Sequence, residues 1–540
     1  MDNLGSIDIF IILIYFISVL IVSLLVSRGN STTENYFLAG RQLGWIAIGT
    51  SLFATNISSE HFIGLAGFGA TKGLAVGNIE WLAIIALLLL AWFFAPLFLK
   101  AKVFTVPEFF GKRFNNSSRL FLSILSIFFY IMTKISISLF AGGLLLNAIL
   151  GWDLYTSAII MMIVTGVYTI IGGLRAVVYT SVLQVVFLLL GAVVFTFFCL
   201  NEVGGLGELK KVLPADYFSV FRPASDSEFP WTGIVFGAPI LAIWYWCTDQ
   251  YIVQKILSAK SISAARSGAI LTAFMKILPV FVLVIPGLIA AALFPGINGD
   301  EAYPTLLNAS FIPVGVKGLV LVGVLAALMS SLSSCFISTS TLFTMDLFRY
   351  FQPNATDKKL VLVGRLATTA MVFVGILWIP IVKAFNNHIY IHLQTIQAYF
   401  SPPIAAVFLL GVFWKRINSR GAIWGLTFGT FLGIIRLIDG WTSIDLLHES
   451  TLFSWFFTVN YLHFAVILFG LTVILVIAIS FASKIEYSSL ANEYIVKMVD
   501  FTRLVKSRVY WSNHTKPDRY NRLFSVTILV VLIGLWGFFF

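Results

Sequence analysis

Polar and charged side chains interrupt the second long apolar run of this 540-residue sequence. Asn56, Glu60 and His61 stand within residues 54–61, and Gly64 and Gly67 follow. Polar groups are costly inside a membrane, and they usually mark a site or a path there. The pattern favours a discontinuous helix, whose unwound backbone offers carbonyls and helix ends to a ligand. The alternative is a kinked helix whose polar side chains bond only to their neighbours.

Further hydrogen-bonding groups lie in other apolar runs. Glu80, Lys276 and Gln394 stand among apolar residues, and residues 244–250 read Trp-Tyr-Trp-Cys-Thr-Asp-Gln. Amide, carboxylate and ammonium groups bind hydroxyls, whereas aromatic rings cover the C–H face of a sugar. Because each unpaired buried polar atom costs ~1–3 kcal/mol, a polyol pocket needs several such groups. A structural ion pair between Glu80 and Lys276 is the alternative for those two residues, and Lys134 has no role beyond such a pairing.

A stripe of small residues follows one face of the ninth apolar run. Its members recur at helical spacing. Hydroxyl and carbonyl oxygens are hard ligands that suit an alkali cation, but small residues also allow close helix packing. The residues alone favour neither explanation over the other. The stripe consists of Ala327, Ser330, Ser331, Ser334 and Ser338.

The composition defines the elements that must position these groups. Hydrophobic residues make up 59% of the chain, charged residues 11%, and the mean hydropathy is +0.95. A water-soluble enzyme and a disordered chain are excluded, because one soluble core cannot hide so much apolar surface. In lipid the spans must be helices, and the runs do not alternate as barrel strands do. We predict fourteen spans, at 7–27, 44–70, 76–99, 120–150, 154–173, 178–200, 231–254, 268–295, 314–345, 361–383, 388–413, 421–438, 453–481 and 522–540.

The formal charge of +11 is distributed unevenly along the chain. With the N-terminus outside, most Lys and Arg residues fall in inward-facing loops, which agrees with the positive-inside rule. We therefore expect a multi-pass protein of the cell (inner) membrane with both termini extracytoplasmic. The basic segment 482–521 indicates contact with anionic lipid and not with nucleic acid. Residues 7–27 lack a basic start and a cleavage site, so they are expected to remain as a span.

Distinctive motifs lie at residues 34–40, 56–69, 172–177, 244–254, 325–346 and 402–421. They resemble those of the solute:sodium symporter family, most closely its sodium/glucose cotransporter branch and a bacterial type of member. Similarity runs from about residue 34 to residue 425. The resemblance implies an all-α LeuT-type core of ten helices in two inverted halves of five. That core would occupy residues 44–413, between flanking segments 1–43 and 414–540.

The resemblance also implies roles for individual residues. Sodium is the expected co-transported ion, with no organic cofactor and no obligate protein partner. Tyr245 would act as the inner gate, and Leu65 and Tyr390 occupy outer-gate positions. The sodium ion would bind carbonyls of Ala54, Ile57 and Ala327 and hydroxyls of Ser330 and Ser331. The residues that match the family's sugar-binding positions are Asn56, His61, Glu80, Tyr245, Trp246, Lys276 and Gln394.

Three positions depart from the family's pattern. Ser181 replaces an Asp that relatives use for a second sodium or for sodium exit, which implies one sodium per cycle. Ala242 stands where relatives offer Thr or Asn to the sugar, and Ile337 replaces a common Asn. The expected function is sodium-coupled uptake of a glucose- or galactose-like monosaccharide by alternating access. The alternatives are another polyol such as inositol, a sodium-permeable channel or sensor, and, least favoured, an intramembrane enzyme.

Overall fold

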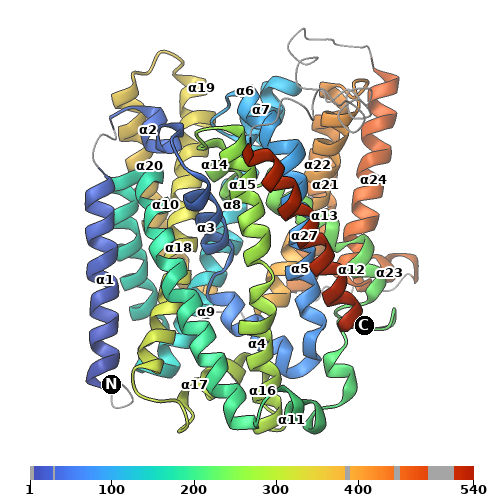
Figure 1. Cartoon of the computed structure of the whole chain (residues 1–540). Coiled ribbons are helices and arrows are strands. Elements are labelled where there is room, and N and C mark those ends of the chain that lie inside the picture. Colours follow the sequence, from blue (N-terminus) through green and yellow to red (C-terminus); the bar gives the residue numbers. More distant parts are fainter. Residues whose placement is uncertain (1–4, 28–30, 384–388, 443–450, 484–515, 540) are drawn as a thin grey trace.

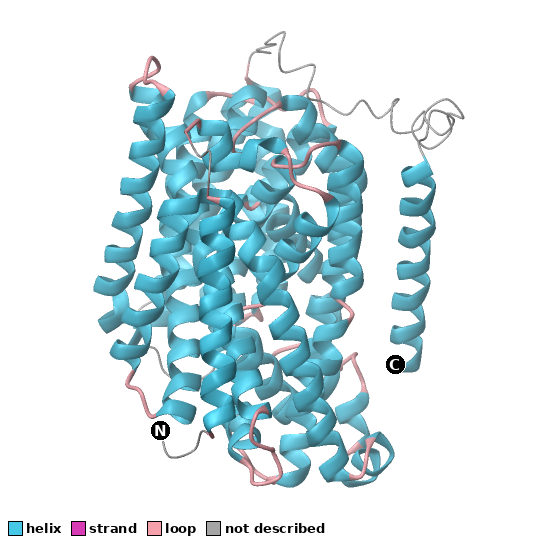
Figure 2. Cartoon of the chain, turned by 60° about the vertical axis from the view of Figure 1, so that its left-hand side comes forward, coloured by secondary structure: helices cyan, strands magenta, loops and turns pink. Residues whose placement is uncertain are grey.

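Hydrogen-bonded helices account for almost all of the computed structural model, which describes the chain except residues 1–4, 28–30, 384–388, 443–450, 484–515 and 540 (Figures 1 and 2). The first helices are α1 (Ser6–Val26), α2 (Thr33–Leu38), α3 (Trp45–Asn56), α4 (Ser59–Lys72), α5 (Gly77–Leu89), α6 (Ala95–Ala101), α7 (Val106–Arg113), α8 (Asn116–Tyr130), α9 (Ser136–Leu150), α10 (Leu154–Val203), α11 (Leu206–Val212), α12 (Trp231–Phe236) and α13 (Ala238–Ile243).

The second half of the chain continues in the same way. It contains α14 (Gln250–Leu257), α15 (Ile262–Met275), α16 (Ile285–Leu293), α17 (Ala302–Asn308), α18 (Val316–Thr341), α19 (Arg349–Phe351), α20 (Asp357–Lys383), α21 (Ile389–Phe413), α22 (Ser419–Thr442), α23 (Thr451–Thr458), α24 (Tyr461–Ala482) and α27 (Lys516–Phe538). Tight 3-10 turns occur at η1 (Ala39–Arg41), η2 (Gly73–Val76), η5 (Ala215–Phe218) and η8 (Gly299–Glu301), and wider π-helical turns at η3 (Leu90–Phe94), η4 (Ile131–Ile135), η6 (Trp244–Thr248), η7 (Val280–Val284) and η9 (Leu342–Phe348).

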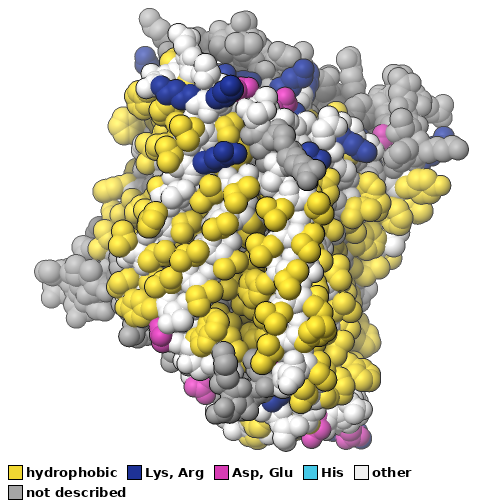
Figure 3. Space-filling view, turned by 90° about the vertical axis from the view of Figure 1, so that its left-hand side faces the viewer, with side chains coloured by type: hydrophobic (Ala, Val, Ile, Leu, Met, Phe, Trp, Pro, Cys, Tyr) yellow, Lys and Arg dark blue, Asp and Glu magenta, His cyan; other side chains and the backbone are white. Residues whose placement is uncertain are grey.

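An apolar band surrounds the molecule. On the face in Figure 3, apolar side chains fill the middle, whereas Lys and Arg gather toward the top and Asp and Glu lie toward both ends. Twelve helical stretches of the described residues are long and apolar enough to cross a membrane. The predicted multi-pass helical architecture is therefore present.

Two of these stretches are at least about twice as long as one span. Residues Ser59–Ala101 and Leu154–Val203 cover 43 and 50 residues, or roughly 65 and 75 Å of helix, about twice the ~30 Å hydrocarbon core. Ser59–Ala101 covers the second half of the predicted span 44–70 together with 76–99, and Leu154–Val203 covers the predicted spans 154–173 and 178–200. The first is divided at η2, where Gly73 has a φ of 71°. The total of fourteen spans stays a prediction.

The second long stretch turns back at Gly173. This residue has a φ of 57° and a ψ of −157°, and a Cβ there would lie 2.6 Å from the carbonyl oxygen of Tyr36. Only glycine takes such a conformation beside another backbone without strain. Both ends of α10 lie at one side of the molecule. The helix before it, α9, contacts α17, and the helix after it, α11, contacts α16, which itself packs against α17.

The two ends of the described chain lie on that same side. Asp8 in α1 accepts a hydrogen bond from the amide of Gly315 at 2.8 Å, and the amide of Val220 donates to the carbonyl of Phe539 at 2.9 Å. Figures 1 and 2 show the start of α1 and the end of α27 toward the lower part of the molecule. That this side faces the cell exterior remains a prediction from the Lys and Arg distribution.

Helix α18 forms the centre of the bundle. Every residue from Val320 to Thr341 is buried, and the helix packs against α1, α3, α10 and α20. The serine-rich stripe is therefore held against other helices and not against lipid. The C-terminal helices pack outside this centre, α22 and α24 against α21 and α27 against α15.

Arg113 fixes a short helix to the end of a long one. Its guanidinium donates to the carbonyls of Gly411, Trp414 and Ile417, at 2.7, 3.2 and 3.0 Å. Burial lowers the pKa of Arg113 to about 10, which leaves it charged at neutral pH. A charged donor that satisfies three carbonyls at a helix end stabilises the junction of α7 with α21.

Candidate functional site

The second predicted span is broken at residues 57–58. Helix α3 ends at Asn56, Ile57 and Ser58 are extended, and α4 begins at Ser59. Ser58 is the N-cap residue of the new helix, where the ring of His61 accepts from its amide at 3.4 Å, and its hydroxyl lies 2.9 Å from that of Ser138 in α9. The break releases the carbonyl of Thr55 to the hydroxyl of Tyr251, 2.7 Å away. The discontinuous helix is thus present, and the kinked continuous helix is wrong.

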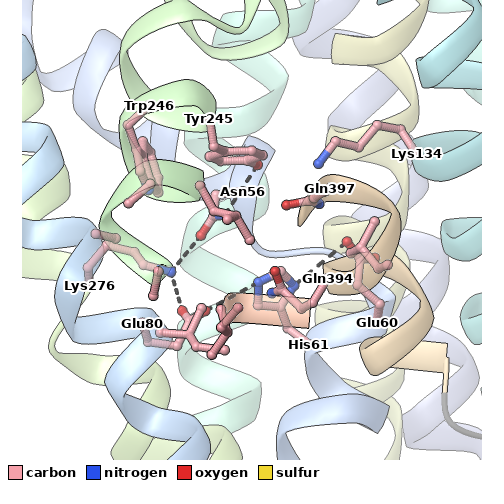
Figure 4. Close-up of a pocket in the computed structure, with 17 residues that line it drawn as sticks. Asn56, Glu60, His61, Glu80, Lys134, Tyr245, Trp246, Lys276, Gln394 and Gln397 are labelled. Carbon is pink, nitrogen blue, oxygen red and sulfur yellow. Dashed lines mark hydrogen bonds and ion pairs between the residues drawn. The ribbon is translucent and has the colours of Figure 1, made fainter. Parts of the chain in front are cut away.

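All seven residues that match the family's sugar-binding positions line one cavity beside this break (Figure 4). They come from six elements that are far apart in the sequence. The turn η6 supplies two neighbouring aromatic rings, and each of the others supplies one side chain. These residues are Asn56 at the end of α3, His61 in α4, Glu80 in α5, Tyr245 and Trp246 in η6, Lys276 at the end of α15 and Gln394 in α21.

Four of these side chains are joined by ion pairs and hydrogen bonds. The ammonium group of Lys276 pairs with Glu80 and donates to Asn56 Oδ1 at 2.6 Å. Asn56 Nδ2 donates to the hydroxyl of Tyr245 at 3.2 Å. The Glu80–Lys276 pair expected as a structural alternative is therefore formed, but it lies at the cavity wall and is not sealed between helices.

His61 faces the same pair from the other side. Its Nε2 lies 3.6 Å from Glu80 Oε1, and its Nδ1 accepts from the backbone. That acceptance assigns the ring proton of a neutral His61 to Nε2, toward Glu80. The cavity wall therefore offers both donors and acceptors at short range, as a hydroxyl-rich molecule requires.

Three further polar residues line the cavity beyond those matched to the family's sugar-binding positions. One of them, Glu60, belongs to the polar run at residues 54–61 that predicted a site. Glu60, Lys134 and Gln397 are all buried. Gln397 follows Gln394 by three residues, so the two share a face of α21, and this spacing was the available signal. Lys134 lies above the ring of Tyr245, with 4.4 Å between its Nζ and the ring centroid, which no sequence pattern reveals. The apolar part of the wall consists of Ile79, Ala83, Ala238, Leu241, Ala242, Leu393 and Leu462.

The three gate positions differ in their placement. Tyr245 lines the cavity. Leu65 is fully buried within α4 and is not among the residues that line the cavity. The side chain of Tyr390 lies outside the described residues.

The five predicted sodium ligands lie where the break meets α18. Ala54, Ile57 and Ala327 are fully buried. The hydroxyl of Ser331 donates to the carbonyl of Thr55 at 3.2 Å, and those of Ser330 and Ser181 lie 2.9 Å apart. The groups that meet here are neutral oxygens, which are hard ligands suited to Na⁺.

Known proteins share these features. The model of the sodium:solute symporter family matches residues 36–429, which is more than half of the chain. The chain belongs to this family. Sodium/glucose cotransporter 4 of Danio rerio is 40% identical over 96% of this chain and 83% of its own length. Sodium/myo-inositol cotransporter 2 of Oryctolagus cuniculus is 39% identical over 92% of this chain and 79% of its own.

A solved structure supports the fold independently. A Na⁺-coupled sialic acid symporter, in a substrate-bound outward-open state, aligns with a TM-score of 0.77 and 24% identity over 89% of this chain and 98% of its own. The predicted fold class, an all-helical membrane transporter of the LeuT type, is confirmed. This symporter family is a family of transporters, so the intramembrane enzyme considered above is not supported.

Proposed function

We propose that this protein couples the inward movement of sodium to that of a neutral sugar or cyclitol, one sodium for each sugar. Two consecutive residues carry the proposal. The carbonyl of Thr55 meets Ser331 at the predicted sodium site, and the side chain of Asn56 meets Lys276 and Tyr245 in the cavity. Any rearrangement of the break therefore acts on both sites together.

The charges at the cavity wall favour a neutral substrate. Two carboxylates, Glu60 and Glu80, face two ammonium groups, Lys134 and Lys276, so the formal charges cancel. Asn56, His61, Glu80, Lys276 and Gln394 would bind hydroxyls, and the ring of Trp246 would cover the C–H face of the sugar. Tyr245, bonded to Asn56, would close the inner side as the gate.

The sodium gradient would supply the driving force. One charge that falls through ~100 mV releases ~2.3 kcal/mol, and a tenfold sodium gradient adds ~1.4 kcal/mol. The total of ~3.7 kcal/mol corresponds to roughly 500-fold accumulation of a neutral sugar. A single sodium ion is proposed because Ser181 offers only a hydroxyl, hydrogen-bonded to Ser330, where relatives carry a carboxylate.

The test is an uptake panel in proteoliposomes with labelled D-glucose, D-galactose, L-fucose and myo-inositol, with and without a sodium gradient. We expect sodium-dependent accumulation of at least one hexose, abolished when choline replaces sodium. The myo-inositol arm tests the second candidate, which is favoured by the relative that carries that name. Sodium current without any sugar, at rates above carrier turnover, would instead support a channel.

A further inference from the structure

The cavity wall has two kinds of polar group. On one side, Asn56, Glu80 and Lys276 satisfy one another. On the other side, Gln397 and Lys134 make no hydrogen bond or ion pair within the described part of the chain. Both residues are nevertheless buried, with only 6% of their surface exposed. Figure 4 shows Gln397 reaching toward Asn56, and Lys134 toward Tyr245, from the opposite wall.

Glu60 adds an acceptor to this second group. Its Oε2 is buried and has no hydrogen-bond partner among the described residues, whereas its Oε1 lies 3.8 Å from His61 Nδ1. Glu60 and Lys134 have opposite charges, yet they do not form an ion pair within 4 Å. Unpartnered buried polar groups are destabilising, so groups retained at a cavity wall find partners in what the cavity holds.

We propose that Glu60, Lys134 and Gln397 form a second hydroxyl-binding wall. The proposal rests on the proposed function and specifies its substrate class. A hydroxyl both donates and accepts, so one hydroxyl can donate to Glu60 while it accepts from Lys134, and the Gln397 amide can do either. The substrate is then a neutral ring with hydroxyls at opposite edges, one edge on the Glu80–Lys276 pair and the other on this wall.

Aromatic rings, and not a carboxylate, hold the ammonium group of Lys134 at the cavity. It lies in the π-helical turn η4, and its Nζ is 4.4 Å from the ring centroid of Tyr245 and 5.0 Å from that of Tyr251. Cation–π attraction holds the ammonium group without occupying its N–H donors in a hydrogen bond to a carboxylate. The donors remain free for a hydroxyl in the cavity.

The wall also accounts for a departure from the family's pattern. Ala242 removes a hydroxyl or amide that relatives present to the sugar, and it lines the same cavity as Gln397. Gln397 has a longer side chain with two donors and an acceptor. We infer that in this protein side chains of α21 and α4 bind the sugar hydroxyl that residue 242 of α13 binds in relatives.

The test pairs side-chain deletions with hydroxyl deletions. Glu60→Gln and Gln397→Leu, with Thr395→Val as a matched control on the same helix, are assayed in proteoliposomes with D-glucose, D-galactose and their monodeoxy analogues as competitors of labelled uptake. In the wild type each important hydroxyl, when removed, should weaken competition roughly tenfold or more. We call this loss of competition the penalty for removing that hydroxyl. In each wall variant the penalty at one ring position should disappear, while the penalties at other ring positions persist. Thr395→Val should keep every penalty.

Four outcomes separate the possibilities. Loss of one position-specific penalty in either variant supports the wall. Uptake that weakens equally for every analogue would overturn it, because a structural or water-binding role acts on all sugars alike. If the wild type takes up none of D-glucose, D-galactose, L-fucose and myo-inositol with sodium, the proposed function fails. If the wild type works and both variants keep every position-specific penalty, the proposed function stands and the wall is overturned. Gln397→Leu replaces a neutral side chain and keeps the test valid if Glu60→Gln does not fold.

Discussion

Ser331→Ala is the most direct probe of the predicted ion site. The change removes one hydroxyl oxygen from the place where α18 meets the broken helix. The Ser331 hydroxyl donates to the Thr55 carbonyl at 3.2 Å, and that carbonyl also accepts from the Tyr251 hydroxyl at 2.7 Å. The carbonyl therefore keeps a partner in the variant, so the fold should lose only about 0.5–1.5 kcal/mol.

The effect on sodium should be larger than the effect on folding. An interaction between a polar group and a charge contributes about 1.5–3 kcal/mol, so loss of this ligand should raise the half-saturating sodium concentration about 10- to 150-fold. The assay is initial uptake of labelled D-glucose into proteoliposomes over a sodium series, with binding of labelled sodium measured without sugar. Ser340→Ala is the control, because it deletes a buried hydroxyl on the same helix that bonds to Gly364 in α20. An unchanged sodium dependence in Ser331→Ala would mean that the ion binds elsewhere.

Three further predictions test other parts of the structure. Lys276→Gln should raise the half-saturating D-glucose concentration roughly 10- to 100-fold, because Glu80 loses its ionic partner and the sugar a charged donor; wild-type affinity would show that the pair is structural only. Current and tracer flux measured together should give one charge per sugar, and two charges would contradict the reasoning from Ser181. Gly173→Ala should lower the melting temperature of the purified protein through a strain of roughly 1–3 kcal/mol, whereas Gly207→Ala, with open space around it, should not.

The sequence predicted the features that depend on local polarity. Hydropathy marked the helices, because a backbone in lipid must satisfy its own hydrogen bonds. The break at residues 57–58 was predictable because Asn56, Glu60 and His61 are too polar for an uninterrupted span. That the seven predicted sugar-binding residues line one cavity came from the resemblance and not from any pattern in this chain.

Contacts between distant helices could not be predicted in this way. The periodicity of a buried helix does not tell which face meets a cavity, since every face is apolar or packed. Tyr245 and Trp246 illustrate the difficulty, because neighbouring residues of a regular α-helix point about 100° apart. Both line the cavity in the structure, from the wider π-helical turn η6. Leu65 shows the opposite case, a matched gate position that does not line the cavity.

The break makes coupling a consequence of chain connectivity. The two proposed sites meet the break at neighbouring residues, whose Cα atoms are ~3.8 Å apart. The carbonyl of Thr55 accepts from Ser331 beside the predicted sodium ligands, and the side chain of Asn56 lines the cavity. A ligand shifts a conformational equilibrium only by its difference in affinity for the two states. Sodium bound between the break and α18 would order the same backbone that presents Asn56 to the cavity, so the sugar would find that backbone already ordered. The coupling must be reciprocal, so sugar tightens sodium binding by the same factor. A transporter built this way needs no separate relay between its two sites.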